Sequence, residues 1–228
     1  CKGISLLPFN PSESRNNFEK AFELFRIRDD RAGMFLSWPF IVYSTMQEGE
    51  DYSLMDNQIS LLEDILRENP LFPSEELRDR ITMGMFTSLG LRQTYHPDIS
   101  LWEGRAFELL ERSCDQNLCL ETGIPLSIYH LWHGNFDRAK LALNILREKT
   151  LSPVASTLAI ITLKIPEAIY DWLVSASHDS CLGRVSNALK LAEDTGVHIW
   201  DHNLLCHIIA SSLSSGDMKP VIFMYPDS

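Results

Sequence analysis

The sequence of 228 residues predicts an all-α fold, a solenoid of antiparallel helical hairpins. Apolar residues recur at helical spacing in almost every segment, whereas the alternating Val/Ile/Thr runs bounded by turn pairs that mark strands are absent. A five-residue pattern also returns about every 42 positions. A repeat of that length indicates stacked units, each of which hides its apolar face against the next one.

The repeated pattern reads Pro-x-x-[Val/Ile]-Tyr at Pro39–Tyr43, Pro125–Tyr129 and Pro166–Tyr170. Between the first two copies, Thr82–Phe86 keeps the apolar and aromatic ending, and a weak fifth copy starts at His207. The five starts are 43, 43, 41 and 41 residues apart. A proline inside a helix removes a backbone hydrogen bond, so we expect the first helix of these hairpins to be bent.

Ten helices are expected along the chain. The first follows a loop with Pro8 and Pro11, is capped by Ser12 or Ser14, and runs to about Arg28 before an Asp-Asp pair breaks it. The other nine are expected at roughly 32–47, 54–68, 74–92, 98–113, 117–133, 136–149, 154–175, 178–195 and 198–215. They are expected to pair as hairpins.

The clearest hairpin junction runs from Gly134 to Leu146. Gly134 can end one helix and Asn135 can cap the next, while Ala139, Leu143 and Leu146 form one stripe facing the partner helix. A small residue followed by large apolar residues lets two helices approach closely. This order is that of tetratricopeptide-type repeats, although the spacing here exceeds their usual length of roughly 34 residues.

The chain resembles the tetratricopeptide-like sensor region of MalT-like (LuxR-type, signal-transduction ATPase) bacterial transcriptional regulators. The resemblance rests on LFRIRDDRAGMFLSW (24–38), LWHGNFDRAKLAL (131–143) and LAEDTGVHIWDH (191–202). It implies a right-handed superhelix and a sensing or partner-binding module. Such regulators carry an ATPase domain and a helix-turn-helix domain elsewhere, and neither motif occurs here. We expect residues 1–228 to form a single helical-repeat domain, a piece of a longer multidomain protein.

Charge and composition narrow the possible partners. With 31 acidic and 20 basic side chains, the net charge of −11 would repel a phosphate backbone, so direct nucleic-acid binding by this segment is not expected. No apolar stretch approaches the roughly 20 residues of a membrane span. Five cysteines without a CxxC pair indicate a reducing cytoplasm. Apolar residues at Val221–Tyr225 could make the chain a homo-oligomer.

Aromatic and histidine side chains gather in the first helices of the later repeats, which commonly line the concave surface of a solenoid. Rings there could stack on a ligand, with His and Asp supplying hydrogen bonds. Interhelical core is the competing interpretation, above all for the tyrosine and the tryptophans. The candidate ligand-binding residues are Tyr129, His130, Trp132, His133, Trp172, His198, Trp200 and Asp201.

Metal and catalytic motifs are weak. Two pairs, His198 with His202 and His130 with His133, could each place two imidazoles on one helix face, but neither has an identified third ligand. The turn His96-Pro-Asp98 is interpreted as a helix stop followed by a cap. No nucleophile elbow or Cys–His arrangement is recognisable. We therefore expect no metal, no cofactor and no catalytic residue.

The sequence favours a cytoplasmic module that binds a small-molecule effector or a protein partner and transmits its occupancy to neighbouring domains. Ligand binding would favour one superhelical curvature over another. Two alternatives stay open. One is a constitutive protein–protein scaffold, and the more distant one is a metal-dependent enzyme.

Overall fold

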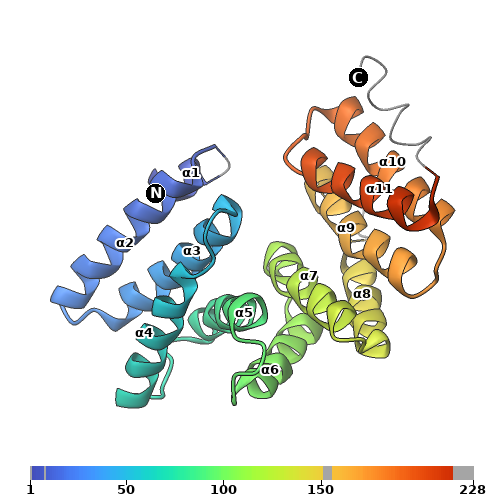
Figure 1. Ribbon diagram of the computed structural model, residues 1–228. Coiled ribbons are helices and arrows are strands. Elements are labelled where there is room, and N and C mark those ends of the chain that lie inside the picture. Colours follow the sequence, from blue (N-terminus) through green and yellow to red (C-terminus); the bar gives the residue numbers. More distant parts are fainter. Residues whose placement is uncertain (1, 8, 151–155, 218–228) are drawn as a thin grey trace. The chain divides into compact units, whose positions relative to one another are not determined.

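The computed structural model describes residues 2–7, 9–150 and 156–217, which form eleven helices and no strand (Figure 1). This confirms the all-helical prediction. Pro8, residues 154–155 and Val221–Tyr225 lie outside the described residues. The helices are α1 (Lys2–Leu6), α2 (Pro11–Ile27), α3 (Arg31–Glu48), α4 (Leu54–Glu68), α5 (Glu75–Arg92), α6 (Ile99–Arg112), α7 (Gln116–Trp132), α8 (Phe136–Thr150), α9 (Thr157–Leu173), α10 (His178–Thr195) and α11 (Asp201–Ser215).

The amino-terminal region differs from the prediction. Lys2–Leu6 forms the short helix α1, where a loop was expected. Asn10, not Ser12 or Ser14, caps α2: its side chain accepts a hydrogen bond from the Glu13 amide at 3.0 Å. Pro11 follows at the first helical position, where its missing N–H costs nothing. Ser14 is buried instead, and its hydroxyl donates to the carbonyl of Gly3 at 2.9 Å.

The predicted break after α2 is present. Asp29 adopts a left-handed conformation with a φ of 53°, and Asp30 then caps α3 by accepting a hydrogen bond from the Gly33 amide at 2.9 Å. Asp tolerates this backbone region better than most residues because its short side chain can bond locally. Gly134, with a φ of 72°, marks the equivalent turn between α7 and α8.

The chain divides into two compact units, residues 1–109 and 110–228. In the first unit, α3 packs against α2, α4 and α5. In the second, α9 packs against α7, α8, α10 and α11, and so lies at the centre of that unit. The core of the second unit joins α7 to α11 through residues such as Leu131, Ile165, Val185 and Leu204. The single helical-repeat domain stays a prediction.

The five repeat starts fall in alternate helices. Pro39, Thr82, Pro125, Pro166 and His207 lie in α3, α5, α7, α9 and α11. Each of the three prolines lies inside its helix rather than at the start. The helical solenoid, its handedness, its period and the bends stay predictions. Within the described part of the chain, no helix is both long enough and apolar enough to cross a membrane.

Candidate functional site

The structure brings four of the predicted site residues together at the carboxyl ends of α7 and α9. We name Tyr129, Trp132, His133 and Trp172 the aromatic cluster. Tyr129 and Trp132 belong to the last turn of α7, His133 is the residue that follows it, and Trp172 lies near the end of α9. α7 and α9 pack against each other. The contact between Trp132 and Trp172 places these two ends side by side.

The two tryptophans form the centre of the aromatic cluster. Their ring centroids lie 6.4 Å apart at an interplanar angle of 81°, an edge-to-face contact. Trp172 packs against the core of the second unit, and its indole N–H donates to the hydroxyl of Ser214 on α11 at 3.2 Å. Trp132 is 59% exposed. One ring is therefore held in place and the other is offered to solvent.

Tyr129 and His133 form a second ring pair at the same end of α7. Their rings are 4.2 Å apart, and Nδ1 of His133 lies 2.8 Å from the carbonyl oxygen of Tyr129. Since a carbonyl oxygen only accepts, Nδ1 carries the proton of the neutral ring. Nε2 of the exposed His133 is then an acceptor available to a ligand.

His130 has a different environment from His133. It is 1% exposed, although its ring also contacts that of Tyr129. Burial, reinforced by the charges of Arg138 and His133, lowers the pKa of His130 to about 4. The side chain is therefore neutral near pH 7 and is part of the core, so a ligand at the surface would contact its neighbours instead.

The remaining three predicted residues lie at the other end of α11. His198 and Trp200 precede this helix and Asp201 begins it, whereas the contact with Trp172 comes from Ser214. Thirteen residues of α-helix separate Asp201 from Ser214, a rise of about 20 Å. Nδ1 of His198 lies 2.8 Å from Oδ2 of Asp201. These residues do not join the aromatic cluster.

A second polar group, which sequence reasoning missed, lies among α8, α9 and α10. We name Glu167, Asp171, Arg147, Lys164 and Arg184 the ion cluster. Glu167 is 2% exposed, and its Oε2 lies 2.9 Å from Nζ of Lys164 and 3.0 Å from Nη1 of Arg184. Arg147 binds its other oxygen, and Arg184 also binds Asp171.

The ion cluster is held by opposing electrostatic effects. Burial alone would raise the pKa of Glu167, but hydrogen bonds from Lys164 and Arg147 hold that pKa below its ordinary value. Ser180 also donates to Asp171 at 2.6 Å. The signal in the sequence was a pair of carboxylates four residues apart on the otherwise apolar α9. The cluster ties three helices together.

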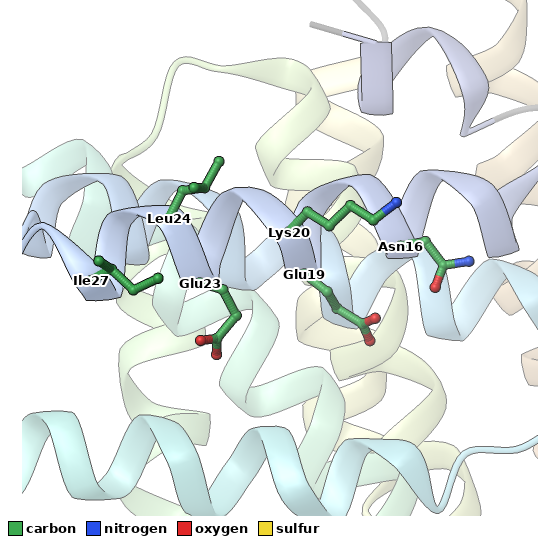
Figure 2. Close-up of a pocket in the computed structure, with 6 residues that line it drawn as sticks. All are labelled: Asn16, Glu19, Lys20, Glu23, Leu24 and Ile27. Atoms are coloured by element: carbon green, nitrogen blue, oxygen red, sulfur yellow. The ribbon is translucent and has the colours of Figure 1, made fainter.

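A surface hollow of about 490 Å³ lies along one face of α2 (Figure 2). All six side chains that line it come from this one helix: Asn16, Glu19, Lys20, Glu23, Leu24 and Ile27. Leu24 and Ile27 are 55% and 77% exposed. A single helix cannot enclose a small ligand, so this face is a flat apolar strip with charged edges.

Buried thiols offer no nucleophile. Burial raises the pKa of Cys119 and likewise that of Cys181, so both are protonated near neutral pH. The described cysteines, Cys114, Cys119, Cys181 and Cys206, are all free.

The two histidine pairs lack a third metal ligand. Within the described residues, neither pair belongs to a group of three potential ligands.

No protein-family model, curated protein or solved structure matches this chain at a significant level. The resemblance to MalT-like regulators therefore stays an expectation, and function is argued from the geometry.

Proposed function

We propose that this chain is a helical-repeat binding module that holds a small organic effector or a short peptide at the aromatic cluster. The observation that supports this is the pair of tryptophans: Trp132 is 59% exposed beside a Trp172 that is anchored to Ser214. An exposed indole supported by a fixed ring presents a flat apolar surface without a large ordering cost on binding. His133 supplies a hydrogen-bond acceptor one residue away.

The proposed wider role is that of a sensor in a bacterial transcriptional or signalling regulator of the cytoplasm. Four free cysteines among the described residues suit a reducing compartment. The aromatic cluster joins the ends of two alternate helices, and Trp172 reaches a third through Ser214. A ligand that prefers one spacing of these ends would shift the population of superhelical curvatures, and attached domains would respond.

A constitutive scaffold is the second candidate, and the exposed strip on α2 favours it. Leu24 and Ile27 lie on the same helix face with charged neighbours on either side. Such a strip suits a partner helix better than a small ligand. A scaffold would respond to no small molecule, whereas the sensor should be stabilised by one compound class.

A thermal-shift screen of the purified chain against oligosaccharides, nucleotides, amino acids and short peptides tests the proposal. A ligand that binds only the folded state at a hundredfold excess over Kd stabilises it by about 2.7 kcal/mol. We expect one class to do so and Trp132→Ala to weaken its binding at least tenfold, a loss of about 1.4 kcal/mol.

The matched control is Tyr95→Ala, which removes an aromatic ring that is 97% exposed but lies outside the aromatic cluster. It should leave the affinity unchanged. If the Trp132→Ala variant binds the identified ligand as tightly as the wild type does, the aromatic cluster is not the binding site. A screen without hits would leave the scaffold as the better account.

A further inference from the structure

Three potential metal ligands meet in the first unit, far along the chain from the aromatic cluster. Glu63 comes from α4, and His96 and Asp98 come from the turn between α5 and α6. One ligand atom from each lies within 4.8 Å of the other two. An imidazole with two carboxylates is a donor set that suits zinc and its neighbours among the divalent transition metals.

His96 already points at Glu63. Its Nε2 lies 2.9 Å from Oε1 of Glu63, and the amide of Asp98 donates to its Nδ1 at 3.2 Å. Two ligand atoms on a tetrahedral metal with bonds of about 2.1 Å are about 3.4 Å apart. The cation would bind the Nε2 lone pair, and the neutral ring would carry its proton on Nδ1 and give up the long bond from Asp98.

Asp98 is the available ligand of the three. As the sequence suggested, Asp98 directly precedes α6, and its main-chain oxygen accepts from the Trp102 amide at 3.1 Å, whereas the helix stop lies earlier, because α5 ends at Arg92. Its exposed carboxylate accepts no hydrogen bond from the described residues. The three ligand atoms now lie up to 4.8 Å apart. The Asp98 side chain is free to turn and shorten its distances by the roughly 1 Å that metal binding requires.

Two of these ligands also line a pocket. Glu63 and Asp98 border a hollow of about 310 Å³ whose other walls include Trp102, Arg67 and Arg105. The Arg105 guanidinium lies 4.6 Å above the Trp102 ring. A cation at the edge of this pocket would keep open coordination positions that face the pocket. The two arginines there suit an anionic co-ligand.

We propose that Glu63, His96 and Asp98 form a binding site for a divalent transition-metal cation, with Zn²⁺ as the best fit, at the mouth of this pocket. The three ligands leave coordination positions for water or for an anion, as in zinc sites that are not purely structural. This proposal is independent of the aromatic cluster.

Titration of the chelator-stripped chain with Zn²⁺, and separately with Ni²⁺, by isothermal calorimetry tests the site. We expect one strong site per chain that Asp98→Asn weakens at least tenfold and His96→Gln at least a hundredfold. Asp98→Asn removes no hydrogen bond of the fold, so its effect reports on the metal.

The matched control is His198→Gln, which alters a second His–Asp contact among the described residues. It should leave the strong site intact, as should Cys206→Ser, which removes a thiol that lies 3.8 Å from the ring of His202. Absence of a strong site, or a site that His96→Gln and Asp98→Asn leave unchanged, would overturn the proposal. Trp132→Ala should bind metal like the wild type, so the two proposals fail separately.

Discussion

Glu167 illustrates how this chain keeps a charge in its core. The carboxylate lies on the central helix of its unit and is 2% exposed, yet Arg147, Lys164 and Arg184 all bind it while reaching solvent with about a third of their own surface. Long cationic side chains can bury their stems and keep part of the charge hydrated. The free-energy cost of desolvation therefore falls mainly on Glu167.

Removal of this acid should be costly. We expect Glu167→Ala to lower the free energy of unfolding by about 3 kcal/mol, because it leaves clustered cations without their buried partner. Urea denaturation at pH 7 measures the change. Glu193→Ala, on an exposed position of α10, is the control and should stay within about 0.5 kcal/mol of the wild type. Similar losses in both variants would show that the ion cluster does not stabilise the fold.

His130 should make the fold acid-sensitive. Its folded-state pKa of about 4 lies below the ordinary value of 6.5, so the unfolded chain binds a proton first. The contribution of neutral His130 to the free energy of unfolding is fully present above pH 6.5 and is lost as the pH falls toward 4. Between pH 7.5 and 5 this amounts to about 2 kcal/mol.

Unfolding free energies of the wild type and His130→Gln at these two pH values test this. The variant should lose about 2 kcal/mol less than the wild type over the interval. Tyr95→Ala, which alters an exposed ring of the first unit, should keep the wild-type dependence. Equal pH dependence in the wild type and His130→Gln would mean that this histidine is not buried as a neutral group.

At the scale of helices, two glycines of the second unit show the difference between a glycine needed for helix packing and one that only lowers helix propensity. A methyl group on Gly123 of α7 would lie 2.8 Å from Cδ2 and 2.9 Å from Cγ of Leu146, which is itself fully buried. A methyl group on Gly183 of α10 would meet nothing within 4 Å. Only the first glycine is required for the close approach of α7 and α8.

The two alanine substitutions should therefore have opposite signs. We expect Gly123→Ala to destabilise the fold by about 1–3 kcal/mol through overpacking. Gly183→Ala should stabilise it by about 0.5–1 kcal/mol, because alanine is the better helix former. Circular dichroism melts of both variants suffice. A stabilised Gly123→Ala would show that α7 and α8 are not in close contact there.

The helices themselves could be predicted because their signals are local. Asp30, Gly134 and the apolar spacing mark boundaries within a few residues of those observed. Helix α1 was missed because five residues cannot show a helical period. Asn10 was overlooked as a cap because nearby serines matched the same rule.

The candidate sites could be predicted only where the repeat relates distant residues. Trp132 lies seven residues after Pro125 and Trp172 six residues after Pro166, so the repeated pattern places them at neighbouring positions, and they are in contact. The ion cluster joins three helices, and the Glu63–His96 contact joins a helix to a distant turn. Both depend on tertiary packing, so no local pattern specified them.

At the scale of the whole molecule, the proposed role is the binding of an effector. A chain of net charge −11 should not hold a phosphate backbone, and its core is all-helical in the described residues. The aromatic cluster offers exposed rings on a supported surface. The proposed effector would act by favouring one arrangement of the helix ends that carry these rings.

Indole N–H resonances test this claim most directly, because the chain has five tryptophans. We would record them by nitrogen-15 NMR during titration with a ligand from the thermal-shift screen. We predict that the signals of Trp132 and Trp172 move with ligand concentration, while those of Trp38 and Trp102, which belong to the first unit, stay fixed. Saturating binding that leaves Trp132 and Trp172 unmoved would contradict it.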